Sequence, residues 1–174
     1  MSLSEYLIEE IRTWDVVELP QRAFHGCRHD DIGIDILNLK ISGNKWCSID
    51  AAYAGDYAWH HTRNHQAVPY ILEVLMTEQL TGIQRPKHLN GEAWAPFLGK
   101  CFPQYSGYEL SREFARSIVA HIKVALGNNI NGYISYGGDE IIVTDTERYL
   151  VVESSLKLPM EKTEYLKIKG GVYA

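Results

Sequence analysis

Residues 132–145 read GYISYGGDEIIVTD, two short apolar runs on either side of a Gly-Gly-Asp turn. The sequence changes here to a period close to two, which is typical of β-strands. The pattern continues after a Thr-Asp-Thr turn, so we expect strands at 133–136, 140–144 and 148–152. The C-terminal third of the chain is therefore predicted to be rich in strands.

A clear helical pattern precedes these strands. Phe114, Ile118 and Ile122 recur at every fourth position and would form one apolar face. Ser111 is the expected N-cap of this helix, and Gly127 is a natural residue at its C-terminal end.

The N-terminal half contains shorter signals of both kinds. Ser4 can cap a first helix, and Asp50 can cap an alanine-rich one. Residues 21–24 have the composition of a strand, which Gly26 is expected to stop, and residues 46–49 read as another strand. Helices and strands are thus expected to alternate here.

Three segments have weaker patterns. Alternating isoleucines predict a strand or extended chain over 30–39, and the apolar run 70–76 suits a buried strand as well as a helix. Residues 81–107 are rich in Gly, Pro and aromatic residues without periodicity. We expect a long irregular loop there, and such loops are often functional.

These elements predict an α+β protein with strands at both ends of a helical middle. The chain has 174 residues and no linker-like or low-complexity segment. We therefore expect a single compact domain over 1–174, with an N-terminal helix in 1–20 and the core in 22–158.

Composition excludes several classes of protein. Hydrophobic residues make up 45% of the chain and charged residues 22%, as in ordinary globular proteins. No apolar run is long enough for a membrane span, and the glutamates near the N-terminus do not resemble a secretory signal. The net charge of −5 does not favour nucleic acid as a partner. Three widely spaced cysteines fit reduced thiols in a cytoplasmic protein: Cys27, Cys47 and Cys101.

Two local groups of residues can be assigned a chemistry. His25 and His29 are four residues apart, as are His61 and His65, a spacing that can hold a metal ion on a helix and would suit a metal-dependent hydrolase. No HExxH motif accompanies them, so no metal site is expected. Cys27 lies beside two of these histidines, but a buried, inert cysteine is the favoured interpretation.

A third group is spread along the chain. It comprises Phe24-His25-Gly26, then Trp46-Cys47-Ser48 before an Ala/Tyr-rich helix, and finally Glu140 at the start of a late strand. In order and spacing these fragments resemble the ADP-ribosyltransferase superfamily, in its diphtheria toxin and poly(ADP-ribose) polymerase branch. That branch is known for a His-Tyr-Glu set on three strands or strand edges.

The resemblance extends over most of 22–158, with departures. Trp46 stands where the family has Tyr, and Cys27 replaces the usual Ser or Thr. Glu140 is preferred as the family's glutamate, because its strand aligns without a gap. The strand that follows Glu147 fits the same block almost as well, which makes Glu147 the second choice.

The resemblance implies a split antiparallel or mixed sheet flanked by helices, and NAD as substrate. It implies a toxin- or effector-like mono-ADP-ribosyltransferase that transfers ADP-ribose to an acceptor, expected to be a protein, and releases nicotinamide. It would act in the cytoplasm, its own cell's or a host's. Two alternatives remain open: a non-catalytic interaction or inhibitor module on the same fold, and the metal-dependent hydrolase.

The resemblance also implies roles for single residues. Cleavage of the nicotinamide–ribose bond builds positive charge on the ribose, which the carboxylate of Glu140 would stabilise. Trp46 and Tyr57 would hold the nicotinamide ring between them. His25 would donate to the adenosine ribose, and the backbone of Gly26 would face the nicotinamide amide. Ser48 completes the expected set of NAD-binding residues.

Overall fold

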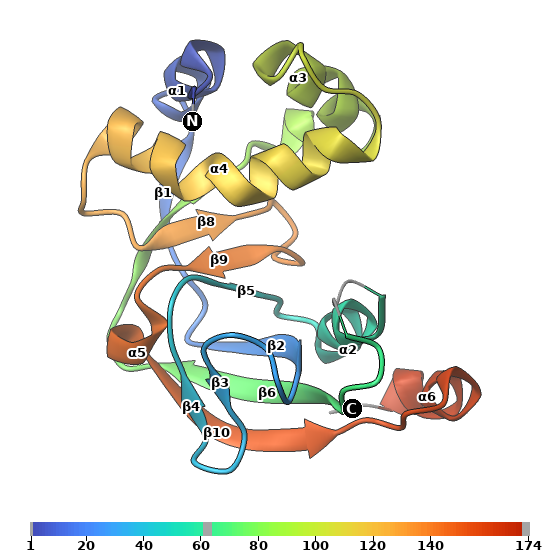
Figure 1. Cartoon of the computed structure of the whole chain (residues 1–174). Helices are drawn as coiled ribbons and strands as arrows, with labels where there is room; N and C mark the ends of the chain where they lie inside the picture. Colours follow the sequence, from blue (N-terminus) through green and yellow to red (C-terminus); the bar gives the residue numbers. More distant parts are fainter. Residues whose placement is uncertain (1, 61–63, 172–174) are drawn as a thin grey trace. The chain divides into compact units, whose positions relative to one another are not determined.

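The computed structural model describes residues 2–60 and 64–171. The chain forms two compact units, each assembled from two stretches of sequence. The first unit comprises Met1–Leu19 and Leu80–Gly137, and the second Pro20–Gln79 and Gly138–Ala174. Helices and strands occur in both (Figure 1), which confirms the α+β class and the split sheet. One domain over 1–174 stays a prediction.

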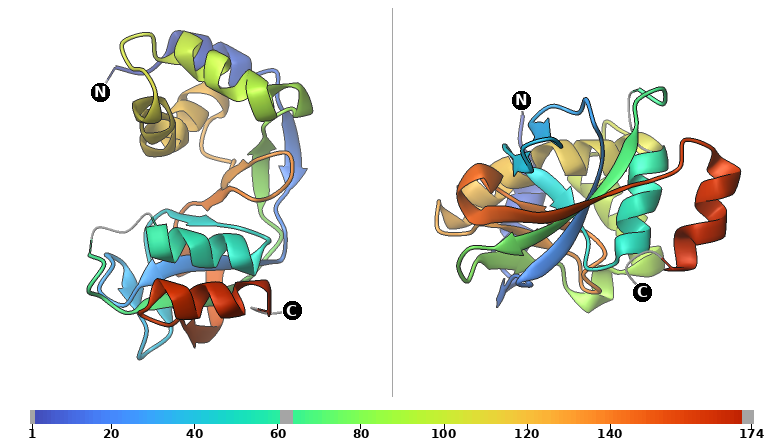
Figure 2. Two further views of the ribbon diagram at one scale, coloured as in Figure 1. Left: turned by 90° about the vertical axis from the view of Figure 1, so that its right-hand side faces the viewer. Right: turned by 90° about the horizontal axis from the view of Figure 1, so that it is seen from below.

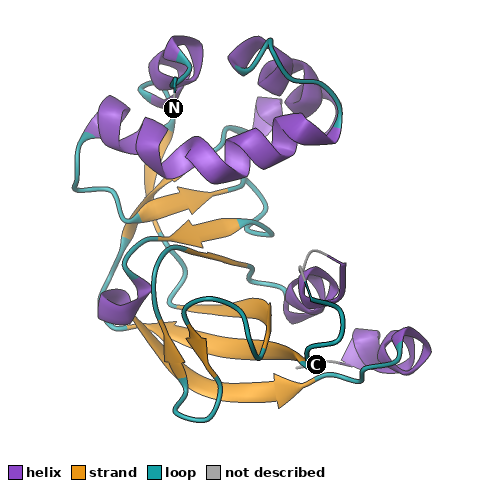
Figure 3. Ribbon diagram, in the orientation of Figure 1, coloured by secondary structure: helices purple, strands orange, loops and turns teal. Residues whose placement is uncertain are grey.

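The first unit combines helices with a short mixed sheet (Figure 3). Strand β1 is antiparallel to β7, and β8 is parallel to β7. Its elements are α1 (Glu5–Ile11), β1 (Asp15–Glu18), β7 (Thr81–Gln84), η1 (Lys87–Leu89), η2 (Gly91–Ala93), α3 (Trp94–Cys101), α4 (Tyr108–Leu126) and β8 (Gly132–Ile134). Within the described ranges, no helix has both the length and the apolar character that crossing a bilayer requires.

Helix α1 begins at the predicted cap and is tied to α4. The hydroxyl of Ser4 accepts a hydrogen bond from the Leu7 N–H at 3.1 Å. The Ser4 N–H donates to Nε2 of His121, a fully buried residue of α4, at 2.9 Å. Ser4 therefore both begins its helix and fixes that helix to the rest of the first unit.

The second unit is built on an antiparallel sheet in the order β10-β6-β2. Strand β5 pairs with β9, and β3 with β4. Its elements are β2 (Arg22–Arg28), β3 (Ile34–Asp35), β4 (Lys40–Ile41), β5 (Lys45–Cys47), α2 (Ala51–His60), β6 (Pro69–Met76), β9 (Ile141–Val143), α5 (Thr146–Tyr149), β10 (Leu150–Lys157), α6 (Lys162–Ile168) and η3 (Lys169–Gly171).

Helix α2 packs on this sheet at very close range. The buried cluster beneath it comprises Phe24, Ala51, Ala54, Ala58, Ile71, Leu158 and Tyr165. A Cβ atom added to Gly26 would lie 1.7 Å from the carbonyl oxygen of Ala54. Glycine at this point of β2 and small side chains on α2 together allow the backbones to approach.

Helix α6 lies beside α2 (Figure 2) and was not expected from the sequence. The hydroxyl of Tyr165 donates to Oδ1 of Asp56 at 2.8 Å, and the Tyr165 ring stacks on Trp59. An ion pair between Lys169 and Asp56 adds a further tie. Because α6 is joined to α2, the C-terminal segment supports the helix that contacts β2.

Several boundaries differ from the sequence-based expectations. Strand β2 continues through Gly26 to Arg28, because pairing with β6 continues on that side. The segment 81–107 is not an irregular loop, because it contains β7, α3 and two 3₁₀ turns. Helix α4 begins at Tyr108, three residues before the expected cap Ser111.

The run 70–76 is a strand, and Asp50 caps α2 as expected. The segment 30–39 contains only the two-residue strand β3, which pairs with β4 immediately after the segment. Arg148 belongs to α5, so the last strand begins at Leu150. These shifts follow from turns and pairings between distant segments, which local composition does not encode.

The close approach at Gly26 predicts a strong effect of a single methyl group. Gly26→Ala should lower the free energy of unfolding by about 1–3 kcal/mol or more, because the methyl group must displace the backbone of α2. Urea denaturation measures this change. Gly99→Ala in α3 is the matched control: its Cβ meets nothing within 4 Å, so it should stabilise by up to ~1 kcal/mol. Equal effects of the two substitutions would contradict the packing argument.

Candidate active site

Strand register in the second unit brings the third group of sequence fragments together. Cys47 pairs with Ile141, so Ser48 and Glu140 are the residues that adjoin this last pair of β5 and β9. Beyond them the Ile49 N–H donates to the Gly138 carbonyl at 3.2 Å. Ser48 is in turn bridged to Phe24: its carbonyl accepts from the Phe24 N–H at 2.7 Å, and its N–H donates to the Phe24 carbonyl at 2.9 Å. Glu140 and β2 thus lie on either side of the chain at Ser48.

Ser48 also begins the helix that packs on β2. Its buried hydroxyl accepts from the Asp50 N–H at 3.0 Å, and Oδ1 of Asp50 accepts from the Ala52 N–H at 2.8 Å. Both bonds satisfy N–H groups that a helix start leaves unpaired. The side chain of Ser48 is therefore used by the fold, and its contact with NAD stays a prediction.

His25 is buried, with a defined hydrogen-bonding direction. Its Nδ1 lies 2.6 Å from the carbonyl oxygen of Trp46, so Nδ1 carries the proton and donates. Burial lowers the pKa of His25 to about 4, partly opposed by this bond, and the charge of Lys45 lowers it further. The neutral ring presents Nε2 as an acceptor. Toward a ligand hydroxyl, Nε2 of His25 would therefore accept a hydrogen bond. This is the reverse of the donor role expected from the resemblance.

The main chain of Gly26 points to the strand edge that carries Ser48. Hydrogen-bonding groups alternate along a strand, so those of Gly26 share the edge used by Phe24. Beyond Ser48 on this edge lies Trp46, whose carbonyl accepts from His25. The sequence did not reveal why residue 26 is glycine. A side chain there would collide with the backbone of α2.

Tyr53 was not expected at the site from the sequence, but it contacts the candidate glutamate, Glu140. Its hydroxyl donates to Oε1 of Glu140 at 3.2 Å. Burial of the phenol, and then the negative charge of Glu140, raise the pKa of Tyr53 to about 12. The signal was present in the sequence, because Tyr53 precedes Tyr57 by four residues and shares its helix face.

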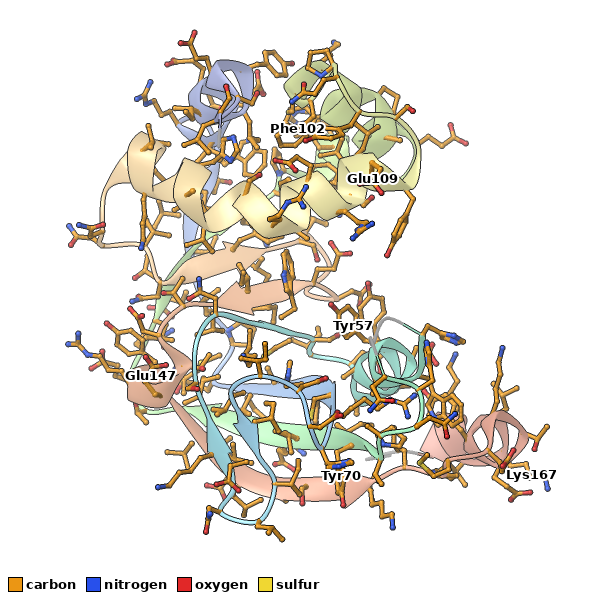
Figure 4. All side chains as sticks on the ribbon, in the orientation of Figure 1. Tyr57, Tyr70, Phe102, Glu109, Glu147 and Lys167 are labelled. Carbon is orange, nitrogen blue, oxygen red and sulfur yellow. The ribbon has the colours of Figure 1, made fainter. Side chains whose placement is uncertain are left out.

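The two expected aromatic partners of nicotinamide lie on different elements. Trp46 is half-buried in β5, opposite Ile142 of β9. Tyr57 is exposed on α2, one turn beyond Tyr53, and is labelled in Figure 4. The sandwich of nicotinamide between Trp46 and Tyr57 stays a prediction.

Glu147 lies on α5, where Figure 4 labels it, whereas Glu140 immediately precedes β9. Its Oε2 accepts from the Gly43 N–H at 2.9 Å, while the Thr146 hydroxyl donates to the Gly43 carbonyl at 2.6 Å. Backbone hydrogen bonds lower the pKa of Glu147. This carboxylate therefore holds the turn before β5.

The structure gives little support to the two other chemistries, a histidine metal site and a cysteine nucleophile. Among residues 2–60 and 64–171, no group of three or more potential ligands is placed to hold a metal ion. Nδ1 of His29 accepts from the Val68 N–H, and His61 lies outside the described residues. Cys27 is fully buried, and burial raises its pKa well above the usual range, so its thiol stays protonated.

Comparisons with known proteins give a fold and no family. No family model and no curated protein matches the sequence. A chain from the crystal structure of the M. tuberculosis MbcT-MbcA toxin-antitoxin complex has a similar structure, with a TM-score of 0.59 and 13% sequence identity. The match covers 97% of this chain and 100% of that chain. The protein therefore has the fold of a component of a toxin–antitoxin complex.

Burial of His25 predicts a pH-dependent stability. The unfolded imidazole has a pKa near 6.5 and binds a proton first as the pH falls, whereas the folded one resists protonation down to about 4. Stability should therefore decrease as the pH is lowered from 6.5 to 4, by about 3 kcal/mol from this residue.

Urea denaturation across this pH range measures the effect. His25→Asn keeps a donor for the Trp46 carbonyl but does not titrate, so its stability should depend less steeply on pH. Other groups, including buried His121, contribute equally to both proteins and cancel in the comparison. Identical pH profiles would show that His25 is not held neutral.

Proposed function

We propose that this protein is a mono-ADP-ribosyltransferase that cleaves NAD, with Glu140 as the catalytic carboxylate. The observation that carries the proposal is the strand pairing in the second unit: Glu140 precedes Ile141, which pairs with Cys47, and the residue after Cys47, Ser48, is bridged to the strand of His25 and Gly26. Three fragments that resemble one enzyme superfamily are thus neighbours in one unit. The toxin–antitoxin fold match supports the toxin-like part of the proposal.

The chemistry asks for a negative charge beside the ribose. As the bond between C1′ and the nicotinamide nitrogen breaks, positive charge develops on the ribose. The carboxylate of Glu140, half-exposed at the start of β9, can stabilise that charge and accept from the ribose 2′-hydroxyl. Glu147 lies on α5 and binds the Gly43 turn, whereas Glu140 adjoins the β5–β9 pairing, which supports choosing Glu140 over it.

The neighbouring groups would bind the rest of NAD. Nε2 of His25 would accept from a hydroxyl of the adenosine ribose, and the main chain of Gly26 would pair with the nicotinamide amide. Trp46 and Tyr57 would contact the nicotinamide ring. Ser48 would position the other residues of the site, because it is bridged to β2 and its hydroxyl binds the start of α2.

The acceptor is proposed to be a protein, and the place of action the cytoplasm. Segment 81–107, with β7 and α3, is the proposed site of acceptor recognition in the first unit. A protein that blocks the activity is a second expected partner, since the matched chain comes from a toxin–antitoxin complex.

Substitution of the two glutamates tests the proposal. Glu140→Gln should reduce nicotinamide release from NAD by about 10²–10³-fold, because the amide keeps the shape but loses the charge. Glu147→Gln should retain release, since that carboxylate binds the Gly43 turn. Released nicotinamide is quantified by chromatography in parallel reactions.

Thermal unfolding with NAD separates binding from chemistry. NAD at 100 times its dissociation constant should stabilise the wild type and Glu140→Gln alike, by ~2.7 kcal/mol. Full activity of Glu140→Gln would overturn the site assignment. Wild-type protein with neither NAD binding nor release would favour the interaction or inhibitor module.

A further inference from the structure

We propose that Tyr53 is a site of self-modification, at which the enzyme attaches ADP-ribose to its own phenolic oxygen. The inference rests on the proposed function and names one acceptor for it: the chain itself. The remainder of the proposal follows from the contact between Tyr53 and Glu140, from the accessibility of Tyr53, and from the atoms that the transfer requires.

A nucleophile and a base lie within hydrogen-bonding reach here. The Tyr53 hydroxyl donates its proton to Oε1 of Glu140 at 3.2 Å, the arrangement in which a carboxylate activates a hydroxyl for attack. Its pKa, raised to about 12, means that the phenol needs such a base. If Glu140 contacts the ribose, the Tyr53 oxygen lies close to the same sugar.

Tyr53 is also accessible. It is 40% exposed, so a ligand beside Glu140 can reach it. It stands on α2, which Asp50 caps and which packs on β2 at Gly26, so its backbone is held in place. Tyr165, by contrast, is 1% exposed and donates to Asp56.

The transfer balances without a further reactant. The bond between C1′ and the nicotinamide nitrogen breaks, and its electron pair leaves with nicotinamide, which departs as a neutral molecule. The Tyr53 oxygen forms a bond to C1′, and its proton passes to Glu140 Oε1 and then to water. An intramolecular acceptor held this close has an effective concentration far above that of a free one.

Modification would also limit the enzyme. An ADP-ribosyl group on Tyr53 would occupy the space beside Glu140 and take away the hydroxyl that donates to it. Nicotinamide release in the absence of another acceptor should therefore show a burst of about one equivalent per chain, followed by a slower phase.

Mass spectrometry of the wild-type protein after incubation with NAD tests the proposal directly. We expect a mass increase of one ADP-ribose, mapped to Tyr53 and resistant to hydroxylamine, which cleaves esters to carboxylates but not phenolic glycosides. Tyr53→Phe should lose the label and the burst. Tyr108→Phe, at an exposed tyrosine of the first unit, is the matched control and should keep both.

The outcomes separate this inference from the proposed function. Nicotinamide release without a label, or a label on another residue, would overturn self-modification at Tyr53 and leave the transferase standing. A hydroxylamine-sensitive label on Glu140 would do the same. Neither release nor NAD binding by the wild type would overturn both. Circular dichroism of Tyr53→Phe establishes that the variant is folded.

Discussion

The contact between Gly26 of β2 and the Ala54 carbonyl of α2 is the constraint on which the second unit depends. It sets the distance between the sheet and α2, the helix that carries Tyr53. Ser48 links the same two elements from the other end, because it is bridged to β2 and also begins α2. The packing of these backbones therefore sets the positions of the side chains in the candidate site.

Much of the secondary structure could be predicted because its signals are local. Ser4 and Asp50 cap their helices as expected, and Gly127 ends α4 with a positive φ of 82°. The segment 81–107 was predicted wrongly, since the Gly and Pro residues that indicate a loop there coexist with β7 and α3. Strand β2 was ended too early because glycine is a weak strand former, and only the packing against α2 explains it.

The site was predictable as a set of fragments but not as a geometry. Order and spacing indicated His25, Ser48 and Glu140, and the β5–β9 register relates them in ways that no periodicity encodes. The hydrogen-bonding direction of His25 depends on the Trp46 carbonyl, a contact across 21 residues. Tyr53 was missed because its partner Glu140 is 87 residues away in sequence, although its spacing from Tyr57 was visible.

Each unit is assembled from two distant stretches, and this matters during synthesis. Strands β2 and β6 emerge from the ribosome well before β10, which pairs with β6 but follows it after β7, α3, α4, β8 and β9. Contacts of such long sequence separation form late. Glu140 likewise emerges only after the whole of the first unit has been made. Under the proposed function, a chain truncated before Glu140 would lack the proposed catalytic carboxylate, so incomplete translation products would not cleave NAD.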